Sequence, residues 1–306
     1  QQLGHQPARK VQGTRLNRPT IPRKRRPVSF IHAELGSTYF KKAYRMSYST
    51  FWKLYNKLEP NIDTMRADKH STRYITNGKI HSSVVLACAL RLFAGGSKYD
   101  LCTSFGISVT CVQASLNYII NAINATPSLA IQFPTSHAKQ REIALGFKQK
   151  STPEFDCCVG ALDGMLVWVQ KPTEKDSEVA KCGTKKFFCM RKGKFGINLQ
   201  AMCNSNRRFL FCNINWPGTS SDHMAWETSN FKHLVEQDGF LAAGLCIFGD
   251  NAYINSTYLA TPYTNASGSK DDYNFFHSQL RINIECAFGM LTSRFGILRS
   301  ALSSSY

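Results

Sequence analysis

The sequence has few acidic residues and no long apolar run. It carries 20 Asp and Glu against 38 Lys and Arg, a formal net charge of +18. The longest apolar runs, Val84–Leu90 and Phe240–Phe248, are shorter than the roughly 20 residues that cross a bilayer. The first 30 residues also lack the apolar segment of a secretory signal. We therefore expect no membrane partner, and the basic balance favours a polyanionic partner, most often nucleic acid.

The chain also lacks any CxxC pair, although it contains 11 cysteines. Closely spaced cysteines are the usual mark of a zinc site, and an odd number of thiols cannot pair completely. We interpret these cysteines as reduced and mostly buried side chains of an intracellular protein. A metal site, if present, has to use other ligands.

Basic residues are concentrated in two segments. Residues 1–45 carry eleven Lys or Arg and one acid, Glu34. We predict a disordered basic arm over residues 1–36, in which "PRKRRP" fits either a nuclear localisation signal or a tail that follows DNA. The nucleus is accordingly the expected location.

The second basic segment covers residues 181–194 and contains no acid. It is either a solvated surface or a contact with a nucleic acid backbone. The candidate DNA-binding residues are Lys181, Lys185, Lys186, Arg191, Lys192 and Lys194.

The segment between residues 37 and 150 is predicted to form a helical domain. "MSYSTFWKLYNKLEP" has apolar residues spaced three and four apart, with Ser47 or Ser49 as the N-cap and Pro60 as the expected end. "SSVVLACALRLFAGG" is typical of a buried helix that ends at two glycines.

A helix-turn-helix layout follows in "SKYDLCTSFGISVTCVQASLNYIINAI". A short helix, a turn at Gly106, a cap at Ser108 and a longer helix give the spacing of that DNA-binding motif. Many helical hairpins share this spacing, so DNA recognition and plain helix packing both remain open.

The pattern changes over residues 151–306, which we predict to form an α/β domain. "CCVGALDG" and "GLCIFGD" are typical of buried strands that end in an acid, and "GINLQAMCN" with "FLFCNINW" predicts a β-hairpin. "MAWETSNFKHLVEQ" and "FHSQLRINIECAFGMLTSRFGIL" have helical spacing. This succession favours a mixed sheet covered by helices.

Three acids occupy positions suited to a metal site. Asp163 and Asp250 are expected at strand ends, where α/β sheets bind ligands, and Glu285 lies on the last helix. Carboxylates brought together repel one another unless a cation separates them, and oxygen ligands suit Mg²⁺ or Mn²⁺. The alternatives are turn or cap roles and, for Glu285, a helix salt bridge with Arg281.

A fourth acid, Asp222, follows a Pro-Gly turn and precedes a helix. It is either the N-cap of that helix or a further carboxylate of the metal site. A hydrolase that uses an acid pair without metal, such as a glycosidase, is a separate alternative. The charge of +18 and the aromatic-poor segments around Asp163 and Asp250 speak against it.

Several segments together resemble PIF/Harbinger-type transposases, which are DDE nucleases. They are, in order, "CVGALDG", "KFGINLQAMC", "NWPGTSSD", "GDNAY", "TPY" and "RINIECAFGMLTSRFGILR". "FGISVTCV" and "FPTSHAKQREIALGF" are similar to the N-terminal half of that family, so the resemblance spans about residues 40–300. Its most specific piece is Arg281-x3-Glu285-x2-Phe288-Gly289, followed by Arg294-Phe295.

The resemblance implies an RNase H-like catalytic core that cuts and joins DNA with divalent metal. It assigns catalysis to Asp163, Asp250 and Glu285, and metal binding to these three and Asp222. Water and then a 3′-hydroxyl would attack phosphodiester bonds. The implied partners are transposon ends, target DNA, a Myb-like DNA-binding protein and further copies of the chain.

Two departures from that family qualify the expected activity. Met165 and Leu166 stand where the family has a Thr-His pair, and the chain stops at Tyr306, which suggests truncation of the 151–306 domain at its C terminus. The alternative function is therefore a domesticated transposase-derived protein that binds DNA without cutting it.

Overall fold

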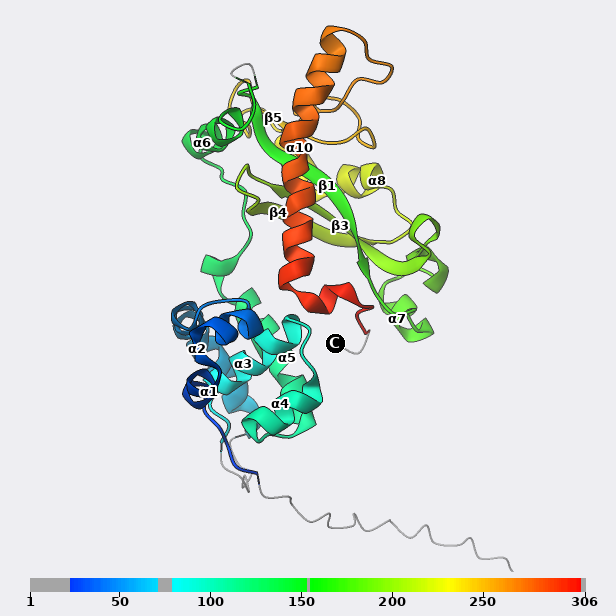
Figure 1. Cartoon of the computed structure of the whole chain (residues 1–306). Coiled ribbons are helices and arrows are strands. Elements are labelled where there is room, and N and C mark those ends of the chain that lie inside the picture. The colour runs from blue at the N-terminus through cyan, green and yellow to red at the C-terminus, as the bar shows by residue number, and fades with distance from the viewer. Residues whose placement is uncertain (1–22, 71–78, 153–154, 304–306) are drawn as a thin grey trace, which may run out of the picture.

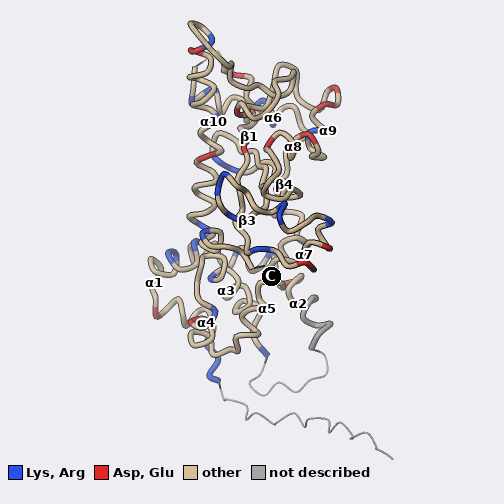
Figure 2. Tube along the Cα trace, turned by 90° about the vertical axis from the view of Figure 1, so that its right-hand side faces the viewer, with Lys and Arg blue, Asp and Glu red and all other residues tan. Residues whose placement is uncertain are grey.

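The computed structural model describes residues 23–70, 79–152 and 155–303. A helical part lies at one end of the molecule and a sheet covered by helices at the other, as Figure 1 and Figure 2 show from two sides. This architecture confirms the predicted fold class, an α/β core preceded by a helical N-terminal region. It is consistent with the RNase H-like domain that the resemblance implies.

The helical part has its core around the apolar helix α3. Val84–Leu90 is buried along its whole length, and Phe51, Phe105 and Ile119 from three other helices join the same cluster. The helices are α1 Val28–Tyr44, α2 Tyr48–His70, α3 Ser82–Phe93, α4 Lys98–Phe105 and α5 Val109–Asn124, followed by the short 3₁₀ helix η1 Pro127–Leu129.

The prediction of a disordered arm up to residue 36 is wrong for its last part, because α1 begins at Val28. Val28 and Ile31 are buried in the helical core. This packing stabilises the helix although the residues just before it are basic. Gly36, with φ of 70°, breaks α1 into two pieces. Residues 1–22 lie outside the described part of the chain.

The expected helix end at Pro60 is also wrong, since α2 continues to His70. A proline inside a helix removes one hydrogen bond and costs about 3 kcal/mol. Leu58 and Ile62 on either side are fully buried, so the apolar face offsets that cost. At the other end Ser47 Oγ accepts a hydrogen bond from Thr50 N at 3.1 Å, which confirms Ser47 rather than Ser49 as the cap.

The predicted helix-turn-helix layout is confirmed as geometry. Gly106 ends α4 in the left-handed region, Ser108 caps α5, and the two helices are bent by 103°. Arg25 Nη1 donates to Gly106 O at 2.7 Å, so the start of the described chain lies on this turn. Among described helices, none alone is long and apolar enough to cross a membrane. The bent α4–α5 pair passes that test together, by length and composition only.

The sheet is mixed, with β1 at its centre. The antiparallel strand β3 pairs with one side of β1 and the parallel strand β5 with the other. β3 continues to β4 and β2, and β5 continues to β6. The strands are β1 Cys158–Trp168, β2 Phe188–Cys189, β3 Lys194–Cys203, β4 Phe209–Pro217, β5 Cys246–Phe248 and β6 Leu259–Ala260.

Helices cover both faces of the sheet. The long helix α10, Ser269–Arg294, crosses one face in Figure 1 and packs Leu280 and Ile284 into a core cluster with β1 and β3. Trp226 and Phe231 belong to the cluster on the other face. The remaining helices are α6 His137–Lys148, α7 Glu174–Val179, α8 Asp222–Glu227, α9 Asn230–Val235 and the 3₁₀ helices η2 Thr184–Phe187, η3 Met190–Lys192 and η4 Gly296–Arg299.

Three local predictions for this part need correction. "MAWETSNFKHLVEQ" forms two helices, because the Ser229 side chain caps a new helix. The last helix ends at Arg294, so Phe295 and Leu298 lie beyond it. β1 runs on to Trp168, which places Asp163 inside the strand and not at its end. In addition, α6 precedes the expected boundary at residue 150 yet packs on β1.

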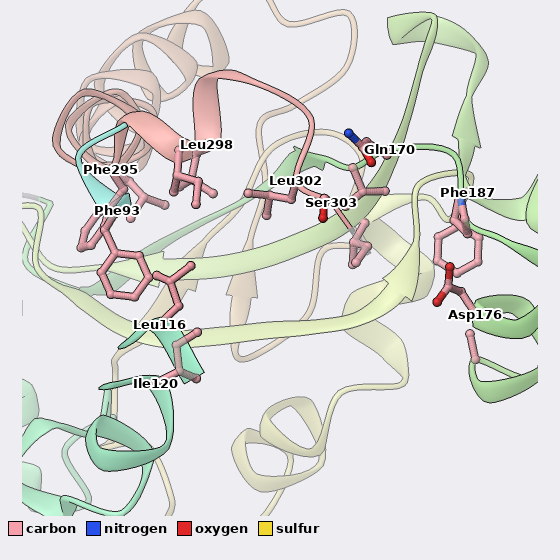
Figure 3. A pocket seen from close by; sticks show the side chains of 16 residues that line it. Phe93, Leu116, Ile120, Gln170, Asp176, Phe187, Phe295, Leu298, Leu302 and Ser303 are labelled. Atoms are coloured by element: carbon pink, nitrogen blue, oxygen red, sulfur yellow. The ribbon is translucent and has the colours of Figure 1, made fainter. Parts of the chain in front are cut away.

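The helical part meets the sheet through a small apolar contact. The rings of Phe93 and Phe295 lie 6.2 Å apart, and a cavity of about 610 Å³ lies beside them. Figure 3 shows Leu116 and Ile120 of α5 on one side of this cavity and Leu302 near the chain end on another. The contact sets α3 and α5 below the end of α10.

Candidate active site

Asp163 lies on β1 at a point where the neighbouring strand has already ended. β5 ends at Phe248, which pairs with Ala161, so β1 is open on that side beyond this pair. Met165 and Val167 pack in the cluster beneath α10, and because side chains alternate along a strand, Asp163 faces α10 as well. Its Oδ1 accepts a hydrogen bond from Gly164 N at 2.8 Å.

Arg281 connects Asp163 to Glu285. Its Nη1 donates to Asp163 Oδ2 at 3.1 Å, and its Nη2 donates to Glu285 Oε1 one helical turn away. The helix salt bridge considered for Glu285 is therefore present, and it extends to a second carboxylate. The Arg281 and Asp163 side chains are 22% and 17% exposed, whereas Glu285 is half exposed.

Asp250 lies two residues after the last residue of β5, at the strand end that the sequence predicts. Its Oδ1 accepts a hydrogen bond from Ala252 N at 2.9 Å, which closes a turn. The Asp250 charge also raises the pKa of Asp163. Asp250 can therefore close its turn and still act on Asp163 through its charge.

Asp222 approaches β1 from the opposite face. Its Oδ1 accepts hydrogen bonds from Asn198 Nδ2 at 2.9 Å and Gln200 Nε2 at 2.8 Å, both on β3. A Cβ atom added at Gly164 would overlap Asp222 Oδ1. Asp222 therefore lies on the face of β1 opposite to the face that carries the Asp163 side chain. The alternative of Asp222 as N-cap is wrong, because Ser221 caps α8.

The charges of Asp222 and Asp250 act on the pKa of Asp163. Burial raises the pKa of Asp163 to about 6, the Gly164 N–H and Arg281 lower it, and Asp250 and Asp222 raise it further. Burial also raises the pKa of Tyr253 well above its usual value, and the charges of the same three aspartates add to this. Tyr253 therefore stays protonated, and its hydroxyl donates to Gln200 Oε1 at 2.6 Å.

The sequence analysis does not predict four residues that support the site: Asn198, Gln200, Tyr253 and His277. Asn198 and Gln200 alternate with apolar residues in "GINLQAMC", and two amides on one face of a core strand were the signal that could have found them. His277 is buried and stacks on Phe248 at 4.7 Å between ring centres. Burial lowers its pKa, so it anchors α10 over β5 as a neutral ring.

The donor chemistry of the site suits a hard divalent cation. Asp163, Asp250 and Glu285 offer only carboxylate oxygens, the ligands that Mg²⁺ and Mn²⁺ prefer. Across residues 23–70, 79–152 and 155–303, no three His, Cys, Asp or Glu side chains lie close enough together to hold an ion. The Arg281 guanidinium supplies the positive charge between Asp163 and Glu285 instead.

All six predicted DNA contacts are exposed on one segment between α7 and β3. Figure 2 shows Lys and Arg positions near the labels of these two elements. Three of the six, Arg191, Lys192 and Lys194, line a groove of about 840 Å³ that also contains Gly164 and Asp222. Lys181 and Lys186 line a neighbouring depression of about 830 Å³. The groove joins a basic surface to Asp222, whereas Asp163 and Asp250 do not line it.

Gly164→Ala is expected to destabilise the protein by about 1–3 kcal/mol, the usual cost of overpacking. The new methyl group would force Asp222 away from its two amide donors. Urea denaturation measures the loss. Gly289→Ala is the control, because nothing lies within 4 Å of a Cβ there, and alanine in a helix should stabilise slightly. Equal stability of both variants would contradict the close approach of Asp222.

Comparison with known proteins agrees with this geometry. Residues 162–306 match the family model of the DDE superfamily endonucleases. The chain is 24% identical over 232 residues to a protein named ALP1-like from Arabidopsis thaliana, an alignment that covers 71% of this chain and 54% of that protein. The chain thus spans about half the length of that curated relative. No solved structure matches it significantly. The family resemblance is confirmed at this level: residues 162–306 are similar to the endonuclease domain of the DDE superfamily.

Proposed function

We propose that this protein is a metal-dependent DNA endonuclease of the transposase type. The observation that carries the proposal is the register of β1 and β5, which pairs Ala161 with Phe248 two residues before Asp163 and Asp250, with Glu285 of α10 joined to Asp163 through Arg281. These residues lie in the part of the chain that matches a DDE endonuclease family, and that family implies a DNA substrate.

Asp163, Asp250 and Glu285 would hold Mg²⁺ or Mn²⁺. Asp222 lies on the opposite face of β1, so it would act on this site through its charge and not as a ligand of the same ion. When bound, the metal makes a water molecule nucleophilic and stabilises the leaving 3′ oxygen of a phosphodiester. Burial of Asp163 excludes water from part of the site, and the buried His277 and Leu280 fix α10, the helix that carries Glu285. Asn198 and Gln200 hold Asp222 in one orientation.

The proposed reaction has two steps. Hydrolysis breaks a P–O3′ bond and leaves a 3′-hydroxyl and a 5′-phosphate. That 3′-hydroxyl then attacks a target phosphodiester, so that a new P–O bond forms while the target's own 3′ oxygen leaves with a proton. No covalent enzyme intermediate is needed, so the chain's residues act by positioning and by charge.

The groove lined by Arg191, Lys192 and Lys194, which also contains Asp222, would hold the DNA backbone. Replacing all three by Gln is expected to weaken DNA binding and to reduce the salt slope by about 2–3, since each phosphate contact contributes about 0.9. Fluorescence anisotropy at several salt concentrations measures this. The matched control is Lys53, Lys57 and Lys139 to Gln, three exposed cations on α2 and α6. Equal losses in both triple variants would argue against the groove.

The helix-turn-helix would add sequence preference. α5 carries no Lys or Arg, and its exposed face offers the amides of Gln113 and Asn117, which suit adenine edges. The basic residues 23–26 lie against its turn, where they could contact phosphates. A Myb-like DNA-binding partner, assembly of several copies and a nuclear location complete the proposal.

A DNA-binding role without cleavage is the second candidate. It is favoured by Met165 and Leu166, apolar side chains that line the groove with Asp222, and by the Arg281 guanidinium between Asp163 and Glu285. A nuclease assay with Mg²⁺ and Mn²⁺ on a DNA that the protein binds separates the two. Metal-dependent strand breaks support the endonuclease, whereas binding without breaks under both metals supports the second role.

A further inference from the structure

We infer that Arg281 is a built-in competitor for the divalent cation, so that metal binding requires Arg281 to leave Asp163 and Glu285. The inference rests on the proposed function only in that a divalent cation binds these carboxylates. Arg281 contacts both of them at once, with Nη1 on Asp163 Oδ2 and Nη2 on Glu285 Oε1. A planar guanidinium can bridge two carboxylates in this way through separate N–H groups.

The contact is stronger than that of an ordinary surface pair. Asp163 and Arg281 are mostly buried, so solvent screens their attraction only in part. Hydrogen bonds between charged groups are also stronger than neutral ones. A divalent cation would need the same oxygen lone pairs, and two neighbouring cations would repel each other. Arg281 and the metal therefore exclude each other on Asp163.

Only the side chain has to move. Leu280 and Ile284, the neighbours of Arg281 and Glu285 along α10, are fully buried and hold the helix on the sheet. Arg281 is partly exposed and has a long side chain, so it can turn away by rotation about its χ angles. Glu285 is half exposed and free to follow the ion once Arg281 has left it. Metal binding thus replaces the Arg281 guanidinium by the divalent cation, while α10 keeps its position.

The test is the affinity of the whole chain for Mn²⁺, measured by titration calorimetry without DNA at about pH 8, where Asp163 is ionised. Arg281→Gln is expected to lower the Kd about tenfold or more, because the metal no longer displaces a charge-assisted contact. Arg281→Lys keeps the charge but cannot bridge two carboxylates in the same way, so its Kd should lie between those of Arg281→Gln and the unsubstituted chain. Lys270→Gln removes an exposed charge from the first turn of α10 and should change little.

A second measurement uses the unsubstituted protein and avoids any folding defect. The Arg281 Nε–Hε signal in an NMR spectrum is identified by its loss in Arg281→Gln. It is expected to shift and to exchange faster with water as Mg²⁺ is added. An unchanged signal at saturating Mg²⁺, or a Kd for Arg281→Gln equal to or weaker than that of the unsubstituted chain, overturns the inference.

The outcomes separate this inference from the proposed function. If the unsubstituted protein cuts DNA with Mg²⁺ while Arg281→Gln binds metal no better, the competition is refuted and the endonuclease stands. If Arg281→Gln binds metal and the unsubstituted chain does not, the competition is supported in its strongest form. If no variant binds metal, both the inference and the endonuclease proposal fail.

Discussion

Asp250→Ala is expected to abolish metal-dependent DNA cleavage while DNA binding stays intact or becomes tighter. Asp250 follows β5 and lies within electrostatic reach of Asp163, so its loss removes an oxygen ligand from the proposed metal site. A metal contributes several kcal/mol to the transition state, and the expected loss of rate is therefore roughly a thousandfold. Removal of a carboxylate also reduces the repulsion of phosphates.

The measurement is a cleavage assay with Mg²⁺ or Mn²⁺, paired with anisotropy of the same DNA. Asp238→Ala serves as the matched control, because Asp238 is an exposed residue after α9, away from the site. It should cut at the rate of the unsubstituted chain. Cleavage by Asp250→Ala at that same rate would end the endonuclease assignment.

Asp163→Asn is expected to stabilise the metal-free protein at about pH 8 while it abolishes cleavage. Burial raises the pKa of Asp163 from 3.8 in the reference state to about 6. One pKa unit corresponds to about 1.4 kcal/mol, so ionised Asp163 costs the fold about 2–3 kcal/mol. The neutral amide removes that cost, as is common where a site is optimised for function and not for stability.

The sign of the pH dependence follows from the raised pKa. Above about pH 6 the folded state carries the unfavourable charge in full. As the pH falls through 6 towards 4, the folded protein takes up a proton before the unfolded chain does, and the cost disappears. Urea denaturation in EDTA at about pH 8 and about pH 4 should show the gain of Asp163→Asn at the higher pH only. A variant less stable at about pH 8 would contradict the argument.

The sequence predicts local features of the site well. The strand end before Asp250, the hairpin of β3 and β4, and the i,i+4 pair of Arg281 and Glu285 all depend on neighbouring residues. Periodicity and turn residues are enough to find such features. The length of β1 is different, because Met165–Trp168 is held as a strand by pairing with β3, and no local pattern reports a partner.

The features that the sequence could not supply are contacts between distant residues. Arg281 and Asp163 lie 118 positions apart, and their hydrogen bond exists only because α10 packs on β1. The two hydrogen bonds from the Asn198 and Gln200 side chains to Asp222 likewise depend on the β3–β4 hairpin, which brings Asp222 back beside β3. The face on which each aspartate lies also depends on the register of β1, which a difference of one residue would reverse.

The link between Asp163 and Gly164 has a mechanical consequence. One peptide plane separates a carboxylate that faces α10 from a glycine that receives Asp222, and the Gly164 N–H itself donates to the Asp163 side chain. A tilt of this plane turns both residues together. A shift of Asp222 would therefore reach Asp163 on the far side of the sheet within a single residue, without any movement of the long helix.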